Sequence, residues 1–137
     1  MYIGKMADHS FTIVDKFLLG FSKRLCRAIA KEFGLYYKSV NVMHHTDDAW
    51  PNSWGYCCDK YIVIKFKKGD KYLPVEEIVD TLTHEMAHLS DPEEEDGARI
   101  TYKEMHNSEW KKRHRNYLKF ARKHIRKRDL CLPGMIL

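Results

Sequence analysis

The sequence predicts an α+β domain built from three helices and a small sheet. Apolar residues recur at three- and four-residue spacing in three stretches, which is typical of helices that bury one face. Between the first two of these stretches lie two short segments with the alternation or the β-branched composition of strands. Hydrophobic residues make up 44% and charged residues 31% of the chain, a composition typical of globular proteins. We therefore expect a single domain over residues 1–137.

The first predicted helix covers residues 8–33. Asp8 or Ser10 is placed to cap its start, and Gly34 follows its last turn, where a left-handed residue ends many helices. The positions expected to face the core are Phe11, Val14, Leu18, Phe21, Leu25, Ile29 and Phe33. A core-packing helix is all that this stretch indicates.

Two strands are predicted between the first and second helices. Residues 39–45 alternate apolar and polar side chains, and residues 61–66 are rich in β-branched and aromatic residues. The loop 47–55 carries two tryptophans, which we expect either to form a small satellite core or to line a substrate-binding rim. Residues 67–70, Lys-Lys-Gly-Asp, are predicted to turn the chain toward the second helix.

The second predicted helix begins near Pro74, a residue favoured in the first turn of helices, and ends near Leu89. Its apolar positions are Val75, Ile78, Val79, Leu82, Met86 and Leu89. Residues 90–97 read Ser-Asp-Pro-Glu-Glu-Glu-Asp-Gly, in which Pro92 and Gly97 end the helical pattern and the acids favour a solvated loop.

This second helix carries the motif His84-Glu85-x-x-His88. Residues four apart lie one turn apart on one helix face, so both imidazoles can bind one zinc ion at about 2.0–2.1 Å. Glu85 lies about 100° around the helix axis from His84, where its carboxylate can take a proton from water instead of binding the metal. Structural histidines, buried or solvated, are the alternative, and the helical context of the motif favours a zinc site.

A catalytic zinc site needs a third protein ligand and an open fourth position. His106 is our candidate, because it precedes the last predicted helix and Trp110, one turn later, can anchor that end of the helix in the core. The alternatives are the carboxylates of Glu94, Glu104 and Glu109.

A second metal site would combine His44 and Asp47 with the adjacent Cys57 and Cys58, but no known ligand spacing supports it. The four cysteines form no C-x-x-C pair, so we expect reduced thiols in an intracellular protein. The first residues lack a basic region followed by an apolar run, and no stretch approaches about 18 apolar residues. We expect neither a signal peptide nor a membrane span. We therefore expect the protein to be cytoplasmic, or nuclear in a host with a nucleus.

The third predicted helix runs from Ser108 to Arg128 and concentrates the basic residues. Its apolar face carries Trp110, Tyr117, Leu118, Ala121 and Ile125. Residues 111–128 hold ten Lys or Arg and no acid, whereas the rest of the chain has the remaining 14 of 24 bases against all 19 acids, a net charge of −5. This asymmetry predicts either a solvated helix face or contact with DNA or RNA. The residues expected to contact phosphates are Lys111, Lys112, Arg113, Arg115, Lys119 and Arg122.

Three features together resemble a known family. A strand, a short turn and the His84–His88 helix follow in that order, Gly55 leads into that strand after a Trp-rich loop, and His106-Asn-Ser-Glu-Trp110 comes next. Over residues 10–125 the chain resembles the SprT-like and WLM-type (Spartan-related) zinc metallopeptidases, although Asn107 stands where that family usually has glycine.

The resemblance implies a minimal zincin-like fold with one Zn²⁺ on His84, His88 and His106, and peptide hydrolysis with Glu85 as general base. An oxyanion stabiliser such as Tyr102 cannot be assigned from the sequence. We therefore expect a monomeric zinc metallopeptidase that acts on protein substrates and is tethered to DNA or RNA through the basic helix, with no membrane partner. The alternatives are a nucleic-acid-binding module with a structural or vestigial zinc, and a zincin fold that retains zinc for a narrow, non-peptide hydrolysis.

Overall fold

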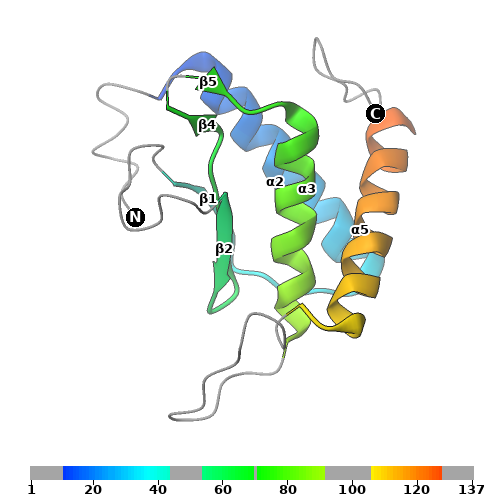
Figure 1. The fold of residues 1–137 in the computed structure, drawn as a ribbon. Coiled ribbons are helices and arrows are strands. Elements are labelled where there is room, and N and C mark those ends of the chain that lie inside the picture. Colours follow the sequence, from blue (N-terminus) through cyan, green and yellow to red (C-terminus); the bar gives the residue numbers. More distant parts are fainter. Residues whose placement is uncertain (1–10, 44–53, 70, 92–105, 128–137) are drawn as a thin grey trace, which may run out of the picture.

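The predicted α+β class is confirmed. The computed structural model describes residues 11–43, 54–69, 71–91 and 106–127. Within these ranges, three α-helices pack with a three-stranded sheet and a short two-stranded ribbon (Figure 1).

Helix α2 spans Ile13–Phe33 and begins later than predicted. Thr12 is its N-cap: the Thr12 hydroxyl accepts from Asp15 N at 3.2 Å, and Thr12 N donates to the Asp15 carboxylate at 2.7 Å. This capping box satisfies two backbone N–H groups and so determines where the helix starts. The predicted caps Asp8 and Ser10 lie outside the described residues.

The predicted end of α2 is confirmed, because Gly34 adopts a φ of 65° and its N–H donates to Ala30 O. Two residues expected to face the core are exposed instead, Val14 at 47% and Phe33 at 37%. Both lie in terminal turns of the helix, which contact fewer neighbouring elements than its middle, although the Phe33 ring still packs on Tyr117 at 4.6 Å.

The sheet contains β1 (Ser39–Val42), β2 (Gly55–Cys58) and β3 (Tyr61–Ile64) in the order β1-β3-β2. β1 runs parallel to β3, and β2 runs antiparallel to it with Cys57 opposite Ile62. Two of these strands were predicted, and β2 was missed because its Gly-Tyr-Cys-Cys sequence shows no alternation.

Tight turns join β2 to β3 and β4 (Lys67–Lys68) to β5 (Lys71–Tyr72). Asp59 and Lys60, with φ of 49° and 66°, form the two-residue turn between β2 and β3, as expected of a primed hairpin. The predicted turn at 67–70 lies in the second hairpin, in which β4 pairs with β5. This hairpin leads directly into the next helix.

Helix α3, Val75–Ala87, is the central element, and a 3-10 turn, η1 (His88–Ser90), continues it. It contacts β2 and β3 on one side and helix α5, Ser108–Lys127, on the other, with α2 behind (Figure 1). The buried residues of α3 include Ile78, Val79, Leu82 and Met86, and those of α5 are Trp110, Tyr117, Ala121 and Ile125. No helix in the described ranges is both long and apolar enough to span a membrane.

Gly55 is the position where β2 and α3 approach most closely, and we predict that Gly55→Ala destabilises the fold. A Cβ atom there would lie 2.7 Å from Val63 O and 2.9 Å from Thr81 Cγ2, so the strand and the helix would have to separate. The free energy of unfolding, measured by denaturant titration, should fall by about 1–3 kcal/mol.

The matched control for this substitution is Gly20→Ala in α2, where a Cβ atom would meet only the end of the Arg24 side chain at 3.3 Å. This variant should gain about 0.5–1 kcal/mol, because alanine loses less backbone entropy than glycine in a helix. A Gly55→Ala protein as stable as its parent would contradict the close packing of β2 on α3.

Candidate metal centre

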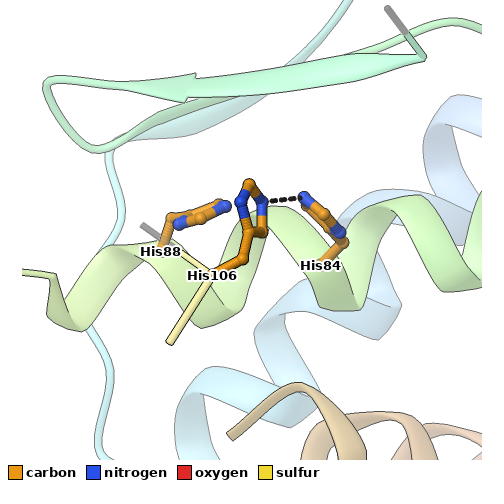
Figure 2. Close-up of side chains that lie close together, drawn as sticks. All are labelled: His84, His88 and His106. Atoms are coloured by element: carbon orange, nitrogen blue, oxygen red, sulfur yellow. Dashed lines mark hydrogen bonds between the residues drawn. The ribbon is translucent and has the colours of Figure 1, made fainter. Parts of the chain in front are cut away.

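Three histidines from two parts of the chain converge beside the end of α3. His84 lies in the last turn of α3, His88 at its C-cap, and His106 two residues before α5. Their rings turn toward one another in Figure 2, and one nitrogen from each lies within 4.8 Å of the other two. The structure thus brings together the three residues that the sequence predicted as metal ligands.

The geometry fits a single metal ion. His106 Nε2 lies 3.2 Å from His84 Nε2, a hydrogen bond between the two rings in the absence of a cation. Two ligands of a tetrahedral zinc at 2.0–2.1 Å lie about 3.3–3.4 Å apart, so these nitrogens are already at ligand spacing. The three histidines can therefore bind a metal ion.

The start of α5 holds His106 in place. Asn107, where the resembled family usually has glycine, accepts a hydrogen bond from Trp110 N through its side-chain oxygen at 3.0 Å. An Asn at this position is a strong N-cap, and it leaves His106 immediately before the first turn. The Asn107 side chain thus caps the start of α5.

The Trp110 ring contacts all three histidines. Its centroid lies 4.6 Å from that of His84 and 4.6 Å from that of His106, and it stacks on His88 at 5.1 Å with an interplanar angle of 24°. Trp110 is 6% exposed, which confirms its predicted role as a buried anchor. Because the ring restricts three imidazoles at once, it limits their movement in the absence of a metal.

Glu85 is buried directly beside this cluster. Its side chain comes within 3.9 Å of His84 Nε2, and the residue is 6% exposed. Burial raises the pKa of Glu85 to about 8, and the negative charge of Asp91 adds to the shift. A bound dication would favour the ionised carboxylate and oppose this shift. Glu85 is therefore a buried carboxyl group beside the three histidines.

The imidazoles of His84 and His88 are held in the neutral form, which is the form that binds metals. Burial lowers the pKa of His84 to about 4, and the neighbouring His88 and His106 rings add to the shift. Burial also lowers the pKa of His88, against the opposing effect of its hydrogen bond to Asp91. Histidine binds metals as a neutral ring, so His84 and His88 do not have to lose a proton before they bind a metal at neutral pH.

Asp91 and Arg113 also belong to the site, and the sequence analysis did not predict either of them there. Asp91 was expected in a solvated acidic loop, yet its Oδ2 lies 2.6 Å from His88 Nδ1. Arg113, expected to contact phosphates, donates instead to Asp91 Oδ1 at 2.7 Å. The i,i+3 spacing of His88 and Asp91 is a signal that could have indicated the first contact.

The alternative third ligands do not join the cluster within the part of the chain that the structure describes. Glu109 is exposed in the first turn of α5 and is absent from the group of converging side chains. Glu94, Glu104 and Tyr102 lie outside the described residues. Among the described residues, His106 is therefore the third member.

The proposed second metal site gains no support. Cys57 and Cys58 are neighbours on β2, so their side chains point to opposite faces of the sheet, and one is half-buried while the other is exposed. Burial raises the pKa of Cys57 to about 12, with a further contribution from Glu85, so this thiol stays protonated at neutral pH. His44 and Asp47 lie outside the described residues.

The remaining expectations for cysteines and tryptophans are met in part. Cys26, Cys57 and Cys58 are free thiols, as predicted. Trp54 from the Trp-rich loop is 40% exposed and lies under the Lys68 ammonium at 5.3 Å, so it does not form a satellite core. The other tryptophan of that loop lies outside the described residues.

The basic residues of α5 do not share one surface. Of the six residues expected to contact phosphates, Lys111, Arg115, Lys119 and Arg122 line a groove of about 530 Å³, together with Arg126. Trp110 and His114 line the same groove, and both rings contact His84. Lys112 is exposed elsewhere on the helix, and Arg113 is turned toward Asp91. The groove thus adjoins the metal centre.

Comparisons of the chain with protein-family models, with curated proteins and with solved structures found no match.

We predict that the metal-free protein loses stability as the pH rises from 6.5 to 8. The folded state binds more protons than the unfolded state at Glu85 between pH 4.5 and about 8, so stability falls with rising pH in that window. His84 acts in the opposite direction, but only between about pH 4 and 6.5. Above pH 6.5 Glu85 dominates, and the loss should reach about 2 kcal/mol.

Denaturant unfolding of chelator-treated protein at the two pH values measures this loss. Glu85→Gln should remove most of it, whereas the control Glu77→Gln, an exposed residue of the same helix, should keep the parental dependence. An unchanged pH dependence in Glu85→Gln would show that Glu85 is not the group responsible.

Proposed function

We propose that this chain is a zinc-dependent metallopeptidase, with zinc on His84, His88 and His106 and with Glu85 as general base. The observation that carries the proposal is the convergence of three imidazoles beside one buried carboxylate. The resemblance of the motif order to SprT-like metallopeptidases supports the same activity. Three protein ligands leave the fourth position of a tetrahedral zinc open, which is typical of catalytic and not of structural zinc.

The protein side chains divide the chemistry between them. A zinc ion in such a site lowers the pKa of water and polarises a substrate carbonyl. Three histidine ligands would hold the ion without adding negative charge, so its positive charge would remain available to the substrate. Glu85 accepts the proton of the attacking water and delivers it to the leaving amine. Its burial shields this proton transfer from bulk solvent.

We predict that the purified protein contains about one equivalent of zinc and that Glu85→Gln keeps the zinc while losing activity. Glutamine has the shape of glutamate but cannot accept the proton. General acid–base catalysis contributes typically 10²–10⁴-fold, so cleavage of a denatured protein substrate should fall at least 100-fold, about 2.7 kcal/mol of barrier. Elemental analysis and a gel-based cleavage assay measure the two quantities.

Two controls separate chemistry from folding in this test. Glu77→Gln makes the same change at an exposed position of α3 and should leave both zinc and activity unchanged. His106→Ala should lose zinc together with activity. A Glu85→Gln protein as active as the parent would exclude Glu85 as the base, and a parent that stays zinc-free after reconstitution would exclude the enzyme.

A second function, binding of nucleic acid, is favoured by the groove on α5. Lys111, Arg115, Lys119, Arg122 and Arg126 line it, so cations that are spread over 16 residues of sequence face one hollow. Phosphate backbones bind such surfaces with little sequence preference, because the contacts are electrostatic. We propose that DNA or RNA lies along this groove, next to the metal centre.

We predict that replacing Lys111, Arg115, Lys119 and Arg122 by glutamine weakens nucleic-acid binding and flattens its salt dependence. For each phosphate that the variant no longer neutralises, the slope of log K against log salt should fall in magnitude by about 0.9 for duplex DNA. Fluorescence anisotropy between low and moderate salt gives the slope. A control with Lys16, Lys23, Arg24 and Arg27 of α2 replaced by glutamine removes the same charge from another exposed face. An equal weakening in both variants would mean that net charge, and not the groove, governs binding.

A further inference from the structure

The carboxylate of Asp91 connects a metal-site histidine to helix α5. Its Oδ2 accepts from His88 Nδ1 at 2.6 Å, and its Oδ1 accepts from the Arg113 guanidinium at 2.7 Å. The side chains are 13% exposed for His88, 22% for Asp91 and 25% for Arg113, so solvent screens these charges only in part. Both contacts are short, as is usual for hydrogen bonds in which at least one partner is charged.

The contact with Asp91 selects one form of the His88 ring. A carboxylate accepts and cannot donate, so the proton of the neutral imidazole resides on Nδ1 and the lone pair on Nε2. Nε2 is then the nitrogen available to a metal. The hydrogen bond and the stack on Trp110 together hold both the tautomer and the plane of the ring.

His88 needs such support because of its place in the backbone. It is the C-cap of α3, where the helix changes to the 3-10 turn and the last carbonyls lack partners within the helix. Two cations from other parts of the chain bind these carbonyls. Arg113 Nε donates to Ala87 O at 3.0 Å, and Lys60 Nζ donates to Leu89 O. Arg113 therefore holds both the backbone before His88 and the carboxylate that orients its ring.

We propose that Asp91 and Arg113 are positioning residues of the metal centre, with Asp91 orienting His88 and Arg113 orienting Asp91. This inference rests on the metal-binding part of the proposed function and not on peptide hydrolysis. Arg113 therefore does not count among the residues proposed to bind nucleic acid, although Arg113 lies within the basic stretch of the sequence. Arg113 can make both of its contacts because a guanidinium presents several donors in a fixed plane, which a lysine ammonium does not.

The test measures zinc affinity by competition with a chromogenic chelator, using the full chain and zinc alone. Asp91→Asn keeps the shape of the side chain but removes its charge, and it should weaken zinc binding about 10–100-fold. Arg113→Gln should weaken binding in the same direction by a smaller factor, and Arg113→Lys should restore part of the loss. Because Arg113 acts in part through Asp91, the double variant should lose less zinc affinity than the product of the two single effects, and the contact of Arg113 with Ala87 O accounts for the effect that remains.

Matched controls and a second measurement decide the outcome. Glu77→Gln and Lys123→Gln each remove one exposed charge, from α3 and from α5, and should bind zinc as the parent does.

In the zinc-loaded parent, proton NMR should show a downfield ring N–H signal of His88 that exchanges slowly with water. The absence of this signal would overturn the proposal without any variant. Parental zinc affinity in Asp91→Asn, or fully multiplicative effects of the two substitutions, would also overturn it. A parent that binds no zinc would overturn the proposed function as well.

Discussion

The packing of Trp110 between α3 and α5 is the interaction on which the metal centre depends. Its indole contacts the rings of His84, His88 and His106, which come from two separate parts of the chain. Burying a tryptophan contributes about 3–5 kcal/mol, enough to outweigh the cost of its indole N–H, which has no hydrogen-bond partner among the described residues. The same side chain therefore stabilises the helix pair and sets the spacing of the metal-binding nitrogens.

The electrostatics of the centre are compatible with a bound cation. Without metal, burial keeps His84 neutral and favours the protonated form of Glu85 at neutral pH. These polar groups are thus held together in a partly desolvated space, next to the ion pair of Asp91 and Arg113. A dication would be stabilised by the neutral imidazoles and would in turn stabilise the Glu85 carboxylate. In the proposed function, metal binding and ionisation of Glu85 would therefore be coupled.

Helix α5 serves different purposes on its different faces. Trp110 and Tyr117 point into the core, and Arg113, between them in sequence, reaches the end of α3. Lys111 and Arg115 face the groove on the outer side. A helix turns about 100° per residue, so cations two residues apart, such as Arg113 and Arg115, can have unrelated partners. The basic stretch is for this reason not a single functional unit.

The sequence by itself determined the class of the fold, the central helix and the pair of histidines on it, because helical periodicity and the His84-Glu85-x-x-His88 spacing are local properties. Only the tertiary structure decided that His106 meets this helix while Glu109 does not, and that Asp91 and Arg113 join the site. These contacts depend on the angle and depth at which α5 packs on α3. Many side chains acting together set that packing, and no spacing along the chain records it.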